Sequence, residues 1–215
     1  MKRITLVITI SLLATLMGVA QEITSSITVY PEFRPATVHL ASGQKMNIPL
    51  ANIFLKNSGL LYMSDNVIKE ANIKKLLRVE FADRTYIRVD SMLAYQVDSI
   101  GSDALFRANV IDIAAYKQAR ANSANITNLD LNFLTDTSAS LSYNTIEATD
   151  KSELQFPIAP VYFYRLDNQF VRVHERHLKR ALPREKERIM EAVMNMPGFT
   201  WSDENFLMMI LKKIQ

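Results

Sequence analysis

The chain has 215 residues, of which 48% are hydrophobic and 22% are charged, a composition that suits one globular domain and excludes a disordered chain. It contains no cysteine, which excludes disulfides, thiolate metal sites, a cysteine nucleophile and a lipidated N-terminal cysteine. The formal charge is only +3, whereas a nucleic-acid-binding protein needs a strong basic excess on one face.

Residues 1–20 have the pattern of a secretory signal peptide. Lys2 and Arg3 form a positive start, residues 4–19 carry no charge, and small residues lead to Ala20. A transmembrane anchor is the alternative, but this run is short for a span, which needs about 20 apolar residues. We expect cleavage after Ala20 and no membrane span after it. Cleavage would remove two of the 25 basic residues and none of the 22 acidic ones, leaving a nearly neutral chain.

Residues 34–112 predict a succession of short strands. Apolar and polar residues alternate over 36–40, 77–81, 85–89 and 106–110, as in strands with one buried face. Gly43, Gly59 and Gly101 fall between these runs, where turns are expected. We expect asparagine and aspartate to make most of the other turns.

Residues 113–155 have a weaker pattern. Ala114–Ala121 predicts one or two helical turns, and residues 129–133 and 141–148 suggest further strands. The polar segment 149–153 is the best candidate for a boundary or a mobile loop.

The C-terminal part combines a hairpin with helices. Asp167-Asn168 separates two strand-like runs within 161–174, which predicts a tight hairpin. Pro183 and Ser202 then mark the starts of two helices. Their apolar stripes are Ile189, Val193 and Met196 in the first helix, and Phe206, Ile210 and Ile214 in the second.

These patterns together predict a mainly β fold. We expect a twisted β-meander, or a small open barrel or sandwich, with the hairpin and two short C-terminal helices packed on one face, α+β overall. The expected organisation is a signal peptide at 1–20, a β-rich body at 21–150, and a hairpin with helices at 151–215 that packs on the same body.

The strongest polar cluster is His174-Glu175-Arg176-His177. On a helix, His174 and His177 would share a face and could bind a divalent metal. The segment is expected to leave a strand, however, where positions three apart face opposite ways. A solvated junction between strand and helix is therefore the favoured interpretation.

A second group of candidates could bind a ligand or partner. Arg172, Arg176 and Arg180 lie in a stretch with eight basic and four acidic residues, which could meet an acidic glycan, a lipid headgroup or a protein surface. Tyr162 and Tyr164 could bind sugars or a partner from the hairpin. The alternatives, which we favour, are a solvated helix entry for the arginines and sheet packing for the tyrosines.

Two stretches carry a resemblance to known proteins. Residues 38–62 contain LASGQ followed by NIFLKNS, and the C-terminal part contains FYRLDN followed by LPREK. Both resemble a family of small, uncharacterised exported proteins of Gram-negative bacteria, in which a β-rich body precedes a hairpin and two short helices. The resemblance implies the periplasm, or secretion to the cell surface, and this architecture.

The leading functional hypothesis is a non-enzymatic cell-envelope protein that binds a partner protein or a glycan. No nucleophile elbow or phosphate-binding loop occurs in the chain, and we expect no cofactor and no nucleic-acid partner. One alternative is a hydrolase-like enzyme with a site around His174, Glu175 and His177. Another is a carrier that holds an apolar ligand in the β-body, in a cavity lined by four residues: Phe54, Leu61, Phe81 and Tyr95.

Overall fold

The computed structural model describes residues 22–121 and 155–215. The expected signal peptide at 1–20, the strands expected at 129–133 and 141–148, and the boundary expected at 149–153 lie outside the described residues. Within them the fold is mainly β, with short helices at the C-terminal end, so the predicted fold class is confirmed.

The described part contains a series of strands joined by short turns. The strands are β1 (Ile23–Thr24), β2 (Arg34–Leu40), β3 (Lys45–Phe54), β4 (Gly59–Ser64), β5 (Val67–Glu70), β6 (Leu76–Glu80), β7 (Thr85–Val89), β8 (Met92–Ile100), β9 (Asp103–Ile111), β10 (Phe156–Leu166) and β11 (Gln169–Arg172). The helices are α2 (Ile113–Ala121), α5 (Glu175–Ala181), α6 (Arg184–Met194) and α7 (Glu204–Ile214), and a single 3₁₀ turn covers Ile73–Lys75.

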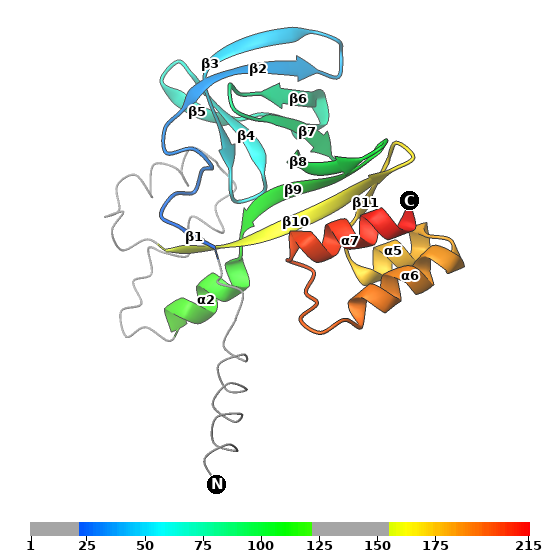
Figure 1. Cartoon of the computed structure of the whole chain (residues 1–215). Coiled ribbons are helices and arrows are strands. Elements are labelled where there is room, and N and C mark those ends of the chain that lie inside the picture. The colour runs from blue at the N-terminus through cyan, green and yellow to red at the C-terminus, as the bar shows by residue number, and fades with distance from the viewer. Residues whose placement is uncertain (1–21, 122–154) are drawn as a thin grey trace.

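All the strands belong to one antiparallel sheet. Its order is β1-β10-β9-β8-β7-β6-β2-β3-β4-β5, with β11 paired to β10 alone. The turn after β3 closes back on the middle of this sheet, because the amide of Ile111 donates to the carbonyl of Leu55 and that of Leu93 to Ser58. The sheet therefore curls into a half-barrel (Figure 1).

Tight turns form where the sequence predicts them. Asp167 and Asn168 both have positive φ, as do Asp65 and Asn66, which is the conformation that two-residue hairpin loops require. Asparagine and aspartate tolerate this region because their short side chains bond locally. At the turn before β4 the positive-φ residue is Ser58 and not the neighbouring glycine.

Asn52 fastens the N-terminal segment to the sheet. Its side chain accepts from the amide of Tyr30 at 3.1 Å and donates to the carbonyls of Tyr30 and Glu32 at 2.9 and 3.2 Å. The residue is fully buried, so these bonds satisfy polar groups that would otherwise be costly to bury. β3 runs unbroken through Asn52.

Two hydrophobic clusters lie on the inner face of the sheet. The cluster inside the half-barrel includes Val38, Val79 and Leu93. The cluster between the sheet and the C-terminal helices includes Leu105, Tyr164 and Leu207. The helices thus cover the face of β8–β10 that continues the barrel interior (Figure 1).

The sequence predicted two C-terminal helices, and the structure has a third, α5, before them. His174 caps its N-terminus by accepting the amide of Arg176, Leu178 is buried, and Lys179 pairs with Glu175 at 2.9 Å. These local contacts stabilise a helix of only seven residues at the place where the sequence predicted the exit of a strand.

The buried stripes of α6 and α7 are rotated slightly from their predicted positions. In α6 the buried residues are Met190 and Val193, while Ile189 is half-buried. Met196, which was predicted to continue the stripe, lies beyond the end of the helix and is 37% exposed. In α7 Phe206 is half-buried, and the buried residues are Leu207, Ile210, Leu211 and Ile214. The predicted packing of both helices is otherwise as expected.

Candidate binding groove

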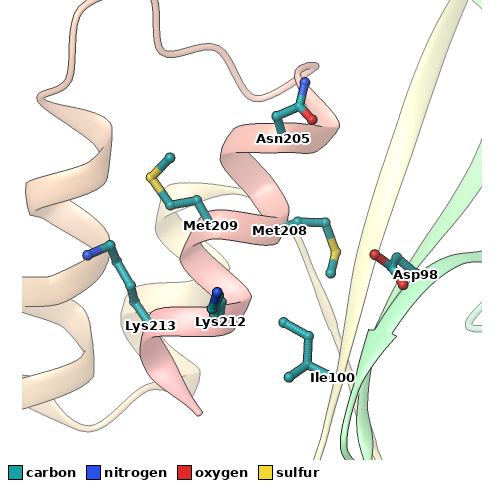
Figure 2. A pocket seen from close by; sticks show the side chains of 7 residues that line it. All are labelled: Asp98, Ile100, Asn205, Met208, Met209, Lys212 and Lys213. Atoms are coloured by element: carbon teal, nitrogen blue, oxygen red, sulfur yellow. The ribbon is translucent and has the colours of Figure 1, made fainter.

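A groove of about 870 Å³ lies between β8 and α7, a size typical of ligand sites. Its lining residues are Asp98, Ile100, Asn205, Met208, Met209, Lys212 and Lys213. Figure 2 shows Met208 pointing from α7 toward Asp98 and Ile100, whereas Met209 and Lys213 point away from β8. Lys212 follows Met208 by four positions and therefore shares its flank of the helix. The side of α7 that faces β8 is thus apolar at Met208 and positively charged at Lys212.

One edge of β8 lies open beside this groove. β7 pairs with β8 only through Met92–Tyr95, whereas β9 pairs with β8 as far as Ile100. Residues 96–100 therefore have a strand on one side only within the described part of the chain, and Gln96, Asp98 and Ser99 are exposed. An open strand edge is a template for pairing with a further extended chain.

Asp98 protects this open edge. Its Oδ1 accepts the backbone amide of Ser99 at 2.7 Å, so this amide does not bond to β9. The register between β8 and β9 also shifts between Gln96 and Asp98. A charged residue and a bulge are both devices that keep edges from uncontrolled pairing. The edge is therefore available, but only to a chain that displaces the Asp98 carboxylate.

The two ends of the groove are defined by contacts of α7. At the C-terminal end, the side-chain amide of Gln215 donates to the carbonyl of Ile100 at 2.8 Å. At the N-terminal end, Glu204 accepts from Arg107 Nη1 at 3.1 Å and from the hydroxyl of Tyr162 at 3.0 Å. The helix α7 therefore runs in the same direction as β8, with Lys212 near Ile100.

A row of three tyrosines and one arginine crosses the sheet near Glu204, at the N-terminal end of α7. Tyr86, Tyr95, Arg107 and Tyr162 are successive register partners on β7, β8, β9 and β10, so their side chains share the inner face. Burial raises the pKa of Tyr86, Tyr95 and Tyr162, and the nearby arginines oppose this rise. The three hydroxyls therefore stay protonated and can donate hydrogen bonds at neutral pH.

Two donors at this row have no carboxylate partner, and they lie against each other: the Arg84 guanidinium and the Tyr86 hydroxyl. The guanidinium of Arg84 lies over the ring of Tyr95 at 4.2 Å and has no ion pair within the described residues. The hydroxyl of Tyr86, in a side chain only 2% exposed, has no hydrogen-bond partner. Buried hydroxyls nearly always find a partner, so this end of the groove has unused donor capacity.

The structure places the predicted binding tyrosines in the interior. Tyr162 and Tyr164 are 4% and 0% exposed. The hydroxyl of Tyr164 donates to the carbonyl of Leu207 at 2.6 Å, and that of Tyr162 bonds to Glu204. Both residues therefore fasten α7 to the sheet, which agrees with the favoured packing interpretation, and neither is among the residues that line the groove.

The predicted arginine group is divided between two surfaces. Arg172 pairs in register with Phe163, while its neighbour Val173 packs in the cluster beneath the helices. Arg172 therefore lies on the face of the sheet away from the helices. Arg176 and Arg180 are exposed on the outer side of α5, opposite the buried Leu178. A single ligand-binding surface is not formed by these three residues.

The two histidines lie together, because α5 places them on one turn. Their ring centroids are 6.1 Å apart, and the ring of His174 stacks on Trp201 at 6.3 Å. However, His174 Nδ1 accepts the amide of Arg176 at 3.3 Å, and Glu175 pairs with Lys179. No group of three metal-ligating side chains occurs in residues 22–121 and 155–215. This geometry favours a helix cap over a metal or catalytic centre.

The residues expected to line an apolar carrier cavity do not share one cluster. Phe54 and Leu61 belong to one hydrophobic cluster, whereas Phe81 and the half-buried Tyr95 belong to another. Their side chains therefore pack in separate parts of the interior.

None of the helices in the described part combines the length and hydropathy that a membrane span requires.

Sequence reasoning missed the groove itself. Met208 and Lys212 looked like ordinary positions beside the apolar stripe of α7, and Asp98 looked like part of a turn. Strand lengths did not indicate the open edge in advance, because the alternating runs at 85–89 and 106–110 have the same length, whereas β7 has five residues and β8 has nine. Only the register of β7 on β8 shows which residues remain unpaired.

The chain was compared with protein-family models, curated proteins and solved structures. No family model, curated protein or solved structure matches it. The functional argument therefore rests on the geometry of the groove.

Proposed function

We propose that the protein is a non-catalytic binding protein that captures an extended, acidic segment of a partner protein in the groove between β8 and α7. The observation that carries the proposal is the open edge of β8 facing the apolar flank of α7. Main-chain bonds to such an edge supply affinity, and the neighbouring wall selects alternate side chains. The export expected from the sequence would make the partner a protein of the cell envelope.

The dimensions of the two walls support an extended occupant. Residues 96–100 span about 17 Å at 3.4 Å per residue, and the 11 residues of α7 span about 16 Å. A segment of five or six residues would fill this length. Every second side chain of the segment would face Met208, since side chains alternate along a strand.

Charge favours an acidic segment over a neutral one. Lys212 lines the groove, and Arg84 lies over the ring of Tyr95, just before the open edge of β8 begins. Neither has an ion pair among the described residues. Asp98 lies between them, bound to the Ser99 amide. A segment with acidic groups at its ends and apolar or neutral side chains in the middle complements this pattern.

The test uses a pool of synthetic hexapeptides that begin with glutamate and alternate apolar residues with threonine, prepared with both free and amidated C-termini. Peptides retained by the purified protein are identified by mass spectrometry, and the Kd of the tightest is measured by fluorescence anisotropy. We expect binding, together with slower hydrogen exchange of the amides in residues 96–100. Failure of the whole pool to bind would contradict the proposal.

Ser99→Pro tests the edge directly. The substitution removes the amide that bonds to Asp98 and not to β9, so the sheet keeps its pairing. We expect peptide binding to fall at least tenfold, while the matched control Ser99→Ala, which keeps the amide, binds normally. Equal binding by both variants, with unchanged thermal unfolding, would show that the edge is not used.

Lys212→Glu and Lys74→Glu form a second matched pair. Both lysines are exposed, but only Lys212 lines the groove, whereas Lys74 lies in the 3₁₀ turn before β6. We expect the first substitution to weaken binding of the acidic peptide several-fold and the second to leave it nearly unchanged. A protein that dimerises in solution with residues 96–100 already protected would indicate that a second copy, and not a peptide, occupies the edge.

A further inference from the structure

We infer that the captured segment is the C-terminus of the partner chain, running antiparallel to β8, with its terminal carboxylate bound by Arg84 and reached by the hydroxyl of Tyr86. This inference rests on the proposed function and specifies which part of the partner binds. It is carried by the position of β7 and by two groups beside it: the Arg84 guanidinium, which has no ion pair in the described part of the chain, and the buried Tyr86 hydroxyl.

The start of β7 limits how far an added strand can extend. From Tyr86 onward β7 occupies the same edge of β8 that is open at residues 96–100. A strand paired with the open edge is therefore collinear with β7 and meets it at Thr85. A continuous chain would have to turn away sharply at this point, whereas a chain terminus fits without a turn.

Direction follows from charge. An added strand antiparallel to β8 runs from the Lys212 end of the groove toward Gln96, as β7 itself does. Its last residue then lies beside Arg84, which directly precedes β7. A parallel strand would instead place an α-ammonium group beside the Arg84 guanidinium, where like charges repel.

The end of the groove offers donors that suit a carboxylate. The Arg84 guanidinium lies over Tyr95, one residue before the open edge begins, and carries no ion pair in the described part of the structure. The carboxylates nearest to this end are already engaged: Asp83 pairs with Arg34 at 3.2 Å, and Glu204 with Arg107 at 3.1 Å. A guanidinium binds a carboxylate through two parallel hydrogen bonds.

The hydroxyl of Tyr86 completes the site. It is buried beneath the Arg84 side chain and lacks an acceptor, and the charge of Arg84 acts on it. When Arg84 moves from the Tyr95 ring to meet a carboxylate, the hydroxyl gains access to one of the two oxygens. The ligand would thus give Arg84 an ion pair and the Tyr86 hydroxyl an acceptor at once.

The test compares the tightest hexapeptide of the pool with its C-terminal amide. Charge-assisted hydrogen bonds are about twice as strong as neutral ones, so we expect the free carboxylate to bind at least tenfold more tightly. Equal affinity of the two forms would overturn this inference and leave the proposed function standing. Failure of both forms to bind would remove the proposed function and this inference together.

Arg84→Gln tests whether Arg84 binds the C-terminal carboxylate of the peptide. We expect this variant to bind the free peptide about tenfold more weakly and to bind the amide as tightly as the wild type does. The substitution of Arg84 and the amidation of the peptide remove the same interaction, so their effects should not add. Arg188→Gln, at an exposed arginine of α6, serves as the control for net charge. If Arg84→Gln weakened both peptide forms equally, Arg84 would not contact the terminal carboxylate.

Discussion

The hydroxyl of Tyr164 on β10 donates a hydrogen bond of 2.6 Å to the carbonyl of Leu207 on α7. Both residues are 0% exposed, so this bond lies in the middle of the contact between sheet and helix. It holds α7 at a fixed height over the sheet, and α7 forms one wall of the groove.

Tyr164→Phe should lower the free energy of unfolding by about 1 kcal/mol, the usual net value of one hydrogen bond. Leu207→Ala should cost more, about 2–5 kcal/mol, because it leaves a cavity in the same cluster. Urea unfolding followed by both fluorescence and circular dichroism would measure the two values. An unchanged midpoint in both variants would indicate that α7 does not pack on the sheet.

Stability should fall at alkaline pH because of the buried tyrosines. Burial raises the pKa of Tyr30, Tyr162 and Tyr164 above the ordinary value near 10. Below pH about 10 the hydroxyls are protonated in both states. Above it the unfolded chain releases these protons first, so each tyrosine lowers the free energy of unfolding by up to about 1.4 kcal/mol per pH unit.

Urea midpoints measured between pH 8 and pH 11.5 would show this loss. Tyr164→Phe should make the decline less steep, since one titrating group is removed. A midpoint that stays constant up to pH 11.5 would contradict the burial of these hydroxyls.

Asn52→Leu should destabilise the fold by at least about 2 kcal/mol. The substitution keeps the size of the side chain but leaves the buried amide of Tyr30 without an acceptor. The carbonyl of Tyr30 loses the Asn52 donor and keeps the hydroxyl of Thr28. Asn47→Ala is the control, because Asn47 is exposed and contacts only Thr37 through its side chain; it should change stability by less than about 0.5 kcal/mol. Similar unfolding midpoints for the two variants would mean that Asn52 does not fasten the N-terminal segment.

His174→Ala should cost about 1 kcal/mol through loss of the helix cap, whereas His174→Asn should retain most of the stability, since asparagine is a strong N-cap residue. Thermal unfolding would separate the two. If both variants lost equal stability, or if zinc stabilised the wild type and neither variant, His174 would act as a metal ligand and not as a cap.

The export expected from the sequence can be tested by substitutions in residues 1–20. Replacing Leu12 and Leu13 with arginine places two charges in the apolar part of the expected signal peptide. We expect the precursor to accumulate uncleaved in the cell. Fractionation and mass measurement would detect it, and normal processing of this variant would rule out the signal assignment.

The amino-acid sequence by itself determined the features that depend on neighbouring residues. Asp167 and Asn168 tolerate positive φ, so the hairpin between β10 and β11 was predictable. Alternation of apolar and polar residues placed most of the strands. The stripe located α7, whose N-cap is Asp203, one residue after the predicted Ser202. A mainly β fold with C-terminal helices followed from these local preferences.

Tertiary structure alone decided how distant segments meet. The pairing of β2 with β6, and of β1 with β10, joins residues far apart in the chain, and periodicity carries no information about such partners. The same holds for the candidate groove, because none of the residues predicted to bind is among those that line it. The open edge exists because β7 is shorter than β8 and pairs with only part of it. The polar end of the groove forms because Tyr95, Arg107 and Glu204 converge from three elements. Side-chain packing between those elements, which no local pattern encodes, sets both features.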